Sequence, residues 1–443
     1  MTYAAALWYI DGLIRSDHAR SPYHEDKLAR MRRFLTALGD PQAGLRIVLV
    51  AGTKGKGSTA AMIAEILGAS GLRVGLTVKP HLVDYRERIR VGGRMISRGG
   101  LASLVAEVRP AVEAGRDHPG GRPTYVETTV AMALLYFARR RVDVAVVEVG
   151  IGGRLDATNV VDPRVSVITP ISYDHMDILG STLREIAREK AGIIRPGGRV
   201  VSAPQADEAA DVIRQTCAEA GARLVLVGRD VEVVPHASTV DGVRATIRGM
   251  RGRYEVHVPL LGRHQAINAA TAVGAVELLA GDGVLVRPDA VRRGLAAVRW
   301  PARVELVGTL PYILVDVGHN PASMAALCET LREVFAGRRV VLAFGMLATK
   351  DYRAVTALIA PMAATVVTTT PDNPHALPAE DLADEVRRYT PHVIAVQDRR
   401  AAIERARALT GPDDILVVTG SFYLVGMARA WLIHRKPALA ARS

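Results

Sequence analysis

The chain has 443 residues, 49% hydrophobic and 23% charged, a composition typical of a globular protein long enough for two domains. This composition excludes collagenous, disordered and coiled-coil proteins, and no apolar run reaches the roughly 18 residues that a membrane span needs. Lysine and arginine total 57 against 45 aspartate and glutamate residues, a net charge of +12 that favours anionic partners such as nucleic acid, phosphates or polycarboxylates. A composition biased toward arginine and alanine is the alternative explanation.

The N-terminal segment and the cysteines indicate the compartment. Residues 4–10 are apolar, but no basic leader precedes them and Asp11 follows, so we expect no signal peptide and no membrane partner. Cys217 and Cys328 stand far apart without metal-type spacing, which favours a reduced, cytoplasmic protein over a disulfide scaffold. Because the arginines are dispersed and aromatic residues make up only 5%, we expect no nucleic-acid partner.

The first clear strand is the apolar run at residues 46–51, and it leads into a glycine-rich turn and a helical pattern over residues 58–70. Strand, turn and helix in this order form the phosphate-binding unit of α/β nucleotide enzymes. Lys56 supplies a positive charge, and the hydroxyl of Ser58 or Thr59 can reach a phosphate or its Mg²⁺. The strict Walker pattern is not met, because Gly57 separates the lysine from the hydroxyl, and a turn that binds nothing is the alternative. The predicted ATP-binding turn comprises Gly52, Thr53, Lys54, Gly55, Lys56, Gly57, Ser58 and Thr59.

The next elements continue the α/β pattern. Further buried strands are predicted at residues 73–78, 142–149, 165–169 and 199–203, with helices at 128–140 and 182–190. The stretch 224–258 differs, because its short alternating runs at 231–234, 243–247 and 254–258 are broken by glycine and predict an antiparallel annex. A helix over 264–279 follows.

A second series of alternating strands and helices begins near Pro301. Its strands are predicted at residues 312–315, 339–343, 364–368, 392–396 and 415–418, and its helices at 323–335, 352–360, 379–388, 399–409 and 423–432. This is a doubly wound pattern without a glycine-rich phosphate loop of its own. Trp300-Pro301 interrupts helical continuation, so the predicted domain boundary lies there.

Five motifs give a resemblance to a known family. They are AGTKGKGS at residues 51–58, EVGIGGRLDATN at 148–159, YDHMDILG at 173–180, EKAGI at 189–193 and TGSFYLVG at 419–426. In this order and spacing, over residues 20–435, the chain resembles the folylpolyglutamate synthase/dihydrofolate synthase family of the Mur ligase superfamily. The resemblance implies an α/β protein and a monomer, with a P-loop-containing, Mur-ligase-like ATPase domain over residues 1–299 that holds the metal and acid-substrate sites. A smaller, Rossmann-like α/β domain is expected over residues 300–443.

Four residues are assigned to catalysis, namely Lys56, Glu148, His175 and Lys190. Glu148 ends an apolar strand at the edge where α/β sites gather, and a buried carboxylate there needs a cation. Taken alone, His175 could be structural and Lys190 a solvated helix lysine. In the family, the matching lysine is carbamylated and becomes an anionic Mg²⁺ ligand. The resemblance therefore implies a carbamylated Lys190 and two Mg²⁺ ions held among Glu148, His175, Lys190 and Ser58.

The resemblance implies further contacts to both substrates. Asn268, Arg303, Asp316 and, more weakly, His319 match positions that contact ATP in the family. Arg303 and Asp316 lie past the predicted boundary, so the nucleotide is expected to contact both domains; an interdomain salt bridge or a helix cap is the alternative for each residue. The segments Thr124-Tyr125-Val126-Glu127 and Leu155-Asp156-Ala157 match pterin-binding segments.

Three places depart from the family pattern. Lys79 stands where the family has a serine that contacts the first Mg²⁺, and a charged ammonium cannot ligate a metal. Either one Mg²⁺ is held without this ligand, or Lys79 itself reaches the phosphates or an anionic substrate. The family's short pterin loop reads His24-Glu25-Asp26-Lys27, and its Asp-Gly-Ala-His-Asn-Pro motif reads Asp-Val-Gly-His-Asn-Pro at residues 316–321. The first two changes leave ATP use intact and the identity of the acid open.

The expected function is an ATP-dependent carboxylate–amine ligase that adds L-glutamate to a folate or to dihydropteroate through an acyl phosphate. One alternative is a ligase of the same scaffold that acts on a non-folate carboxylic acid. The other is a catalytically silent nucleotide-binding protein, against which the presence of Lys56, Glu148, His175 and Lys190 argues.

Overall fold

The computed structural model describes residues 1–17, 26–116, 118 and 120–434, which divide into two compact units. The first unit consists of Met1–Pro235, Arg244–Val258 and Ala266–Val298. The second consists of His236–Val243, Pro259–Gln265 and the chain from Arg299 onward. Two segments of the second unit therefore come before residue 299 in the chain.

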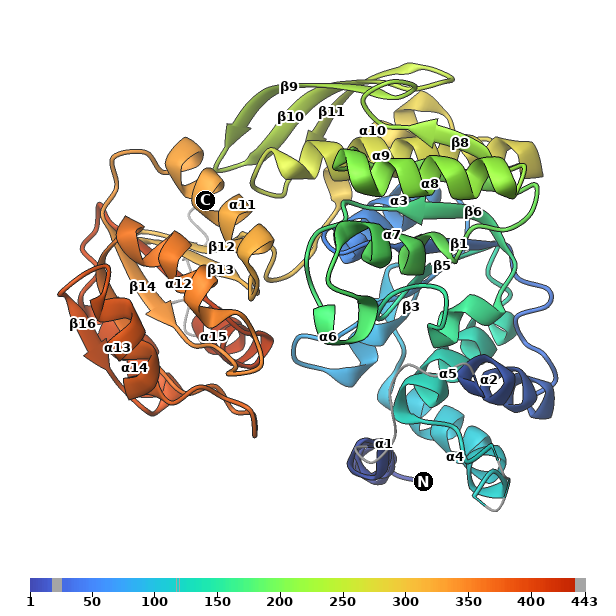
Figure 1. The fold of residues 1–443 in the computed structure, drawn as a ribbon, viewed down its shortest axis with the longest axis horizontal. Coiled ribbons are helices and arrows are strands. Elements are labelled where there is room, and N and C mark those ends of the chain that lie inside the picture. Colours follow the sequence, from blue (N-terminus) through green and yellow to red (C-terminus); the bar gives the residue numbers. More distant parts are fainter. Residues whose placement is uncertain (18–25, 117, 119, 435–443) are drawn as a thin grey trace, which may run out of the picture. The chain divides into compact units, whose positions relative to one another are not determined.

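The first unit is built on an eight-stranded sheet with the strand order β4-β3-β2-β5-β1-β6-β7-β8 (Figure 1). Its strands are β1 (Ile47–Ala51), β2 (Val74–Thr77), β3 (Ile89–Val91), β4 (Arg94–Met95), β5 (Val144–Glu148), β6 (Pro163–Ile168), β7 (Arg199–Ser202) and β8 (Arg223–Leu226). The six strands from β2 to β8 in this order pair in parallel, whereas β3 and β4 add an antiparallel edge. Every residue of β1 and β5 is buried, as expected for apolar strands covered on both faces. The parallel α/β architecture predicted from the sequence is confirmed.

Helices surround this sheet, and several of them have polar residues that fix where they begin. They are α1 (Tyr3–Asp17), α2 (Asp26–Ala37), α3 (Lys56–Ala69), η1 (Tyr85–Arg88), α4 (Arg98–Ala114), α5 (Tyr125–Arg139), η2 (Ala157–Val160), α6 (Met176–Leu179), α7 (Leu183–Ala191), α8 (Asp207–Glu219), α9 (His264–Leu278), η3 (Leu279–Asp282) and α10 (Pro288–Ala297). Thr124 and Thr182 form capping boxes with Glu127 and Glu185 at the starts of α5 and α7. Among the described residues, no helix is both long and apolar enough to cross a membrane.

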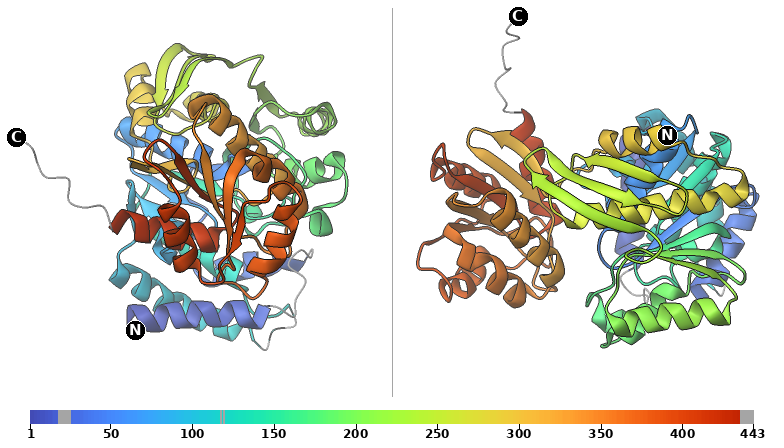
Figure 2. Two further views of the ribbon diagram at one scale, coloured as in Figure 1. Left: turned by 90° about the vertical axis from the view of Figure 1, so that its left-hand side faces the viewer. Right: turned by 90° about the horizontal axis from the view of Figure 1, so that it is seen from above.

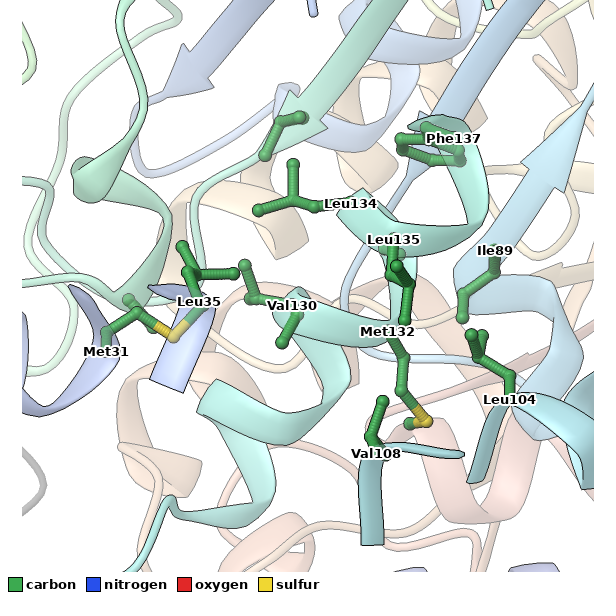
Figure 3. Packing of buried hydrophobic residues seen from close by; sticks show 14 of the residues in the cluster. Met31, Leu35, Ile89, Leu104, Val108, Val130, Met132, Leu134, Leu135 and Phe137 are labelled. Atoms are coloured by element: carbon green, nitrogen blue, oxygen red, sulfur yellow. The ribbon is translucent and has the colours of Figure 1, made fainter. Parts of the chain in front are cut away.

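Helix α5 lies at the centre of the largest part of the core. Val130 of α5 lies beside Leu35 of α2, and Met132 of α5 lies beside Val108 of α4 (Figure 3). Where Phe137 packs on β2, a Cβ at Gly75 would lie 2.7 Å from its ring, so the strand needs glycine there.

Helices α3 and α10 approach each other closely. A Cβ at Gly294 of α10 would lie 2.5 Å from the Cα of Ile66 in α3, so the two backbones are in near contact. Only a residue without a side chain permits this packing distance.

A three-stranded sheet with the order β11-β10-β9 corresponds to the predicted annex. Its strands are β9 (Glu232–Thr239), β10 (Gly242–Arg248) and β11 (Arg253–Val258). The prediction was wrong for residues 224–226, which belong to β8 and pair in parallel with β7 in the large sheet. As an edge strand β8 is only partly buried, so its pattern of exposure resembles that of a half-solvated antiparallel strand.

The second unit has a six-stranded sheet with the order β12-β13-β17-β14-β15-β16, against which helices pack (Figures 1 and 2). Its strands are β12 (Glu305–Thr309), β13 (Tyr312–Asp316), β14 (Val340–Phe344), β15 (Ala363–Thr368), β16 (Val393–Ala395) and β17 (Ile415–Thr419). Its helices are α11 (Pro321–Val334), α12 (Tyr352–Ile359), η4 (Ala360–Met362), α13 (Ala379–Arg387), α14 (Arg399–Ala408) and α15 (Phe422–His434). The predicted strands all pair in parallel, and β12, which was not predicted, forms an antiparallel hairpin with β13.

Candidate active site

The glycine-rich turn lies between β1 and α3, and two of its glycines are required by close approach of the backbone. Gly52 has φ 142° and Gly55 has φ 76°, a conformation that side chains rarely adopt. A Cβ at Gly52 would lie 1.9 Å from Oγ1 of Thr169, and one at Gly55 would lie 2.4 Å from Oδ1 of Asn268. The turn is therefore fixed against the end of β6 on one side and against α9 on the other.

Hydrogen bonds to the segment after β6 hold the turn in place. The backbone N–H groups of Thr53 and Lys54 both donate to the carbonyl of Pro170, at 3.0 and 3.1 Å. The Thr53 hydroxyl lies 3.1 Å from both the carbonyl and the N–H of Ser172. Nζ of Lys54 forms an ion pair with Asp174 at 3.1 Å.

Two lysines from different helices meet at the carbonyl of Gly52. Nζ of Lys56 donates to this oxygen at 3.0 Å and also lies 3.3 Å from the carbonyl of Thr53. Nζ of Lys190, from α7, donates to the Gly52 carbonyl at 2.9 Å, and Lys190 is only 4% exposed. Burial lowers the pKa of Lys190 well below its usual value, and the charges of Lys56 and Lys54 lower it further.

The residues predicted to hold Mg²⁺ have different environments. Glu148 ends β5, is 4% exposed and accepts the backbone N–H of Lys79 at 3.0 Å. Ser58 is buried in the first turn of α3. His175 caps α6 with φ 52°, and its Nε2 lies 3.8 Å from Oδ1 of Asp174. Within residues 1–17, 26–116, 118 and 120–434, no three His, Cys, Asp or Glu side chains converge on a metal position.

The donor chemistry nevertheless fits a hard divalent cation, because Mg²⁺ prefers carboxylate and hydroxyl oxygens. The hydroxyl of Thr77, at the end of β2, is buried and has no hydrogen-bond partner among the described residues. Thr77 pairs in register with Val147, the residue before Glu148. Successive side chains of a strand point to opposite faces, so the Thr77 hydroxyl lies on the face of Val147 and not on that of Glu148, and it gives no support for a cation beside this carboxylate.

The first predicted acid-binding segment begins α5. Thr124 caps the helix, and Tyr125 and Val126 pack partly buried against the core. The carboxylate of Glu127 is fully buried, accepts two hydrogen bonds from Arg30 at 2.9 Å each, and accepts the Thr124 N–H at 2.8 Å. Glu127 thus holds α2 to the start of α5, and its contact with a substrate stays a prediction.

In the second segment, Leu155 and Ala157 are buried, and Asp156 forms a dense set of contacts between them. Its Oδ1 accepts the N–H and hydroxyl of Thr158 at 3.0 and 2.6 Å, and its Oδ2 accepts the N–H groups of Gly150 and Ile151 at 3.2 and 3.3 Å. Nζ of Lys79 lies 3.7 Å from Oδ1. Burial by itself raises the pKa of Asp156, but Lys79, Lys27 and the bonds from Thr158 outweigh it and bring the pKa to about 2.

The predicted loop at residues 24–27 is only partly described. His24 and Glu25 lie outside the described residues. Asp26 begins α2, and Lys27 is buried in the first turn of that helix.

In the second unit, Arg303 lies in a strained segment of backbone. Its neighbours Ala302 and Val304 have φ of 56° and 48°, which is rare for any side chain and especially for a β-branched one. Asp316 accepts the N–H of Val304 at 2.9 Å and that of Gly318 at 2.8 Å, so it holds this segment against the loop after β13. Burial raises the pKa of Asp316.

The ring of Phe422 packs against two of the residues that were predicted to contact the nucleotide. The guanidinium carbon of Arg303 lies 5.2 Å from the centre of the Phe422 ring, and the His319 ring lies 5.7 Å from it at a tilt of 51°. Nδ1 of His319 lies 2.9 Å from the carbonyl of Val317. Asn268, the remaining predicted contact, is buried in α9 of the first unit, with its Oδ1 3.5 Å from the hydroxyl of Thr59.

Sequence reasoning missed two residues, namely Phe422, which packs against Arg303 and His319, and Arg88, whose Nε donates to Nδ1 of His81 at 2.8 Å and whose charge acts on Lys79. Phe422 stands inside the motif at residues 419–426, so a signal for it existed. Arg88 is one of many dispersed arginines, and nothing in its sequence context separates it from the others.

Comparison with known proteins places this geometry in a family. Residues 50–276 match the Mur ligase middle domain, and residues 302–422 match the Mur ligase, glutamate ligase domain. The dihydrofolate synthase/folylpolyglutamate synthase of Bacillus subtilis is 35% identical over 91% of this chain and 94% of its own length. The folylpolyglutamate synthase of Mycobacterium tuberculosis, solved with ADP, superimposes with a TM-score of 0.89 at 34% identity, covering 98% of this chain and all of the other.

A longer relative matches only in part. The probable bifunctional folylpolyglutamate synthase/dihydropteroate synthase of Haloferax volcanii is 39% identical over 90% of this chain but 47% of its own length, so the chain spans about half of that protein. The fold and the phosphate-binding turn thus define a Mur ligase. Within that superfamily, the chain belongs to the folylpolyglutamate synthase/dihydrofolate synthase family, as the sequence motifs predicted.

Proposed function

We propose that the protein is an ATP-dependent ligase that joins L-glutamate to a folate or to dihydropteroate, with ADP and phosphate as the other products. The observation that carries this proposal is the phosphate loop, in which Lys56 and the buried Lys190 both donate to the Gly52 carbonyl. Relatives from Bacillus subtilis and Mycobacterium tuberculosis that match more than nine tenths of the chain are named dihydrofolate synthase/folylpolyglutamate synthase, and one from Lacticaseibacillus casei is named folylpolyglutamate synthase.

The reaction follows from the chemistry of an acyl phosphate. A carboxylate oxygen of the acid attacks the γ-phosphorus of ATP, and ADP leaves. The amine of glutamate then attacks the acyl carbon, and phosphate leaves as the amide forms. Such a transfer depends on positioning and charge neutralisation and needs no covalent protein nucleophile.

The residues of the loop have separate tasks in this scheme. Backbone N–H groups at the start of α3 and the ammonium group of Lys56 hold the phosphates. The carbonyl contacts of Lys56 would be exchanged for phosphate oxygens when ATP binds. Lys54 is paired with Asp174, so it contributes charge near the loop and also anchors the loop. Asn268, Arg303, Asp316 and His319 are proposed as further contacts of the nucleotide.

In this scheme Mg²⁺ would be held by Glu148, Ser58, His175 and a carbamylated Lys190. Substitution of Lys190 tests this assignment. When bound, Mg²⁺ neutralises the negative charge of the phosphates during transfer. The lowered pKa of Lys190 supports carbamylation, because only a neutral amine attacks carbon dioxide. The carbamate would place a negative charge next to Lys56 and Lys54.

The acceptor is proposed from the segments at Thr124–Glu127 and Leu155–Ala157, which match pterin-binding segments of the family. A second candidate, a ligase for a non-folate acid, is kept because Lys79 stands where the family has a serine and lies beside Asp156 in one of these segments. We further propose that the protein acts as a monomer in the cytoplasm, which is consistent with its two free, buried cysteines.

The decisive experiment is phosphate release by the purified protein with ATP, Mg²⁺ and L-glutamate. Dihydropteroate, tetrahydrofolate and a panel of unrelated carboxylic acids serve as acceptors in parallel. Release that requires both glutamate and a pterin acid supports the folate assignment. Release with another acid alone supports the second candidate, and ATP binding without turnover on any acid identifies a silent nucleotide-binding protein.

A further inference from the structure

Lys79 is held in a buried position without the contacts that its ammonium group needs. Its backbone N–H donates to Glu148, which fixes the start of its side chain at the end of β5. The side chain is 10% exposed, and Nζ has no hydrogen-bond partner in the described part of the chain. The distance of 3.7 Å to Oδ1 of Asp156 exceeds the range of a hydrogen bond. An ammonium group has three donors, and leaving them unmade in a buried site costs free energy.

Asp156 does not satisfy this ammonium group, because its own oxygens are already used. Four donors from Thr158, Gly150 and Ile151 surround the carboxylate. These bonds fix Asp156 as part of the loop after β5. The carboxylate therefore balances the charge of Lys79 while leaving its hydrogen-bond donors available.

Other charged side chains act on the ammonium group of Lys79. Lys27 and Arg88 lie near enough for their charges to act on Lys79, against the anions Asp156 and Glu148. His81 adds no charge near neutral pH, because burial and the charge of Arg88 lower its pKa to about 4, and its Nδ1 accepts a hydrogen bond from Nε of Arg88 at 2.8 Å. A buried ammonium group with unmade donors, near two further cations, indicates that an anionic ligand completes the site.

The structure assigns Lys79 to substrate recognition: we propose that its ammonium group binds a carboxylate of the acid substrate. This role rests on the proposed function, since it concerns the acceptor of that reaction. A carboxylate fits better than a phosphate, because the phosphate loop has Lys54, Lys56 and Lys190, whereas Lys79 pairs with a residue of the predicted acid-binding segment.

The test is a binding cycle of two proteins and two ligands, measured by calorimetry without nucleotide. The proteins are wild type and Lys79→Met, which removes the charge and keeps the length of the side chain. The ligands are dihydropteroate and its carboxamide, which lacks only the negative charge. We expect Lys79→Met to raise the Kd of the carboxylate at least about tenfold and that of the carboxamide less than about twofold. Lys79→Arg should keep most of the preference for the carboxylate.

Removing one member of a buried pair can itself destabilise the fold. If Lys79→Met does not fold, the double variant Lys79→Met/Asp156→Asn, which lacks both charges, replaces it. Its Kd values are then compared with those of the single variant Asp156→Asn instead of those of the wild type. Equal losses for both ligands, or no loss for either, would overturn the inference. Weaker binding of a non-hydrolysable ATP analogue with an unchanged preference for the carboxylate would overturn it as well, and would assign Lys79 to the phosphates.

The cycle separates this inference from the proposed function. A wild-type protein that joins glutamate to a pterin acid but shows no coupling between Lys79 and the carboxylate rejects only the role of Lys79. A wild-type protein that binds neither dihydropteroate nor its carboxamide and ligates no pterin acid rejects both.

Discussion

The ammonium groups of Lys56 and Lys190 share one acceptor, the carbonyl oxygen of Gly52, at 3.0 and 2.9 Å. The two lysines come from different helices, and the second is buried. Two like charges at one oxygen are stable only if one of them loses its charge or an anion joins them. The phosphates of ATP and a carbamate on Lys190 are the anions that the proposed reaction supplies.

Lys56→Ala is expected to reduce glutamate-dependent phosphate release by about 10³-fold, since it removes a charge that faces the developing negative charge of the transferred phosphoryl group. The fold should stay intact, because in the described part of the chain the ammonium group of Lys56 bonds only to two carbonyls of its own loop. Phosphate release and the melting temperature measure the two effects. Turnover close to wild type would contradict the assigned role.

Lys190→Ala is expected to lose activity that added bicarbonate does not restore, because no amine is left to carbamylate. A short-chain carboxylate such as propionate should restore part of it by placing an anion in the vacated space. The same carboxylate should not help Lys56→Ala, which serves as the matched control. Mass spectrometry of the native wild-type protein in isotope-labelled bicarbonate checks the modification directly, and an unmodified, fully active protein would speak against it.

Gly55→Ala is expected to weaken nucleotide binding strongly and to lower stability by about 1–3 kcal/mol. The new Cβ would be strained at φ 76° and would also clash with Oδ1 of Asn268. Gly71→Ala is the matched control, because Gly71 has φ 89° but no atom within 4 Å of an added Cβ. Calorimetry with ADP and thermal unfolding compare the two variants. Equal effects of both on ADP binding would show that the contact with Asn268 does not matter.

The stability of the protein should fall as the pH is lowered from about 6.5 toward 4, partly because of His81. Its pKa is lowered to about 4 in the folded state, so the unfolded state binds the proton first. The contribution of His81 to the free energy of unfolding is therefore complete at pH values above its pKa in the unfolded state. It is lost as the pH falls toward its pKa in the folded state. His81→Gln, which keeps an acceptor for Arg88, should reduce the loss by about 2 kcal/mol. Urea unfolding of both proteins between pH 7 and pH 4.5 measures this difference, and parallel curves would contradict it.

Phe422→Leu is expected to raise the Kd of ADP by about three- to tenfold, because the ring supports both Arg303 and His319 and such contacts contribute about 1 kcal/mol each. Tyr423→Leu changes the next residue, which is 47% exposed, and should leave the Kd unchanged. If the two variants bind ADP alike, Phe422 has no positioning role.

Much of the fold could be predicted because its signals are local. Buried strands such as β1 and β5 appear as continuous apolar runs, and the glycines of the phosphate loop mark a turn that side chains would block. Helices α1, α2, α4, α8 and α10 were not predicted. Helix α4 contains three glycines or prolines among its 17 residues, namely Gly99, Gly100 and Pro110, which weaken its helical pattern.

The site could be predicted only as far as its motifs reach. Lys79 and Asp156 are 77 positions apart, and their pairing follows from the ends of β2 and β5 lying side by side in the sheet. The stacking of Arg303 on Phe422 likewise joins residues from opposite ends of the second unit's sequence. Such pairs depend on tertiary structure, and neither partner has a local pattern that identifies the other.

The near contact of α10 with α3 at Gly294 limits how the nucleotide can be released. No layer of side chains separates the two backbones there, so α3 has little room to tilt or slide. We therefore expect α3, the helix that follows the phosphate loop, to keep its position throughout the catalytic cycle. Any loosening that accompanies release of ADP is then expected in the loop ahead of α3 and in the side chain of Lys56, the first residue of α3, which can exchange phosphate oxygens for its two carbonyl contacts.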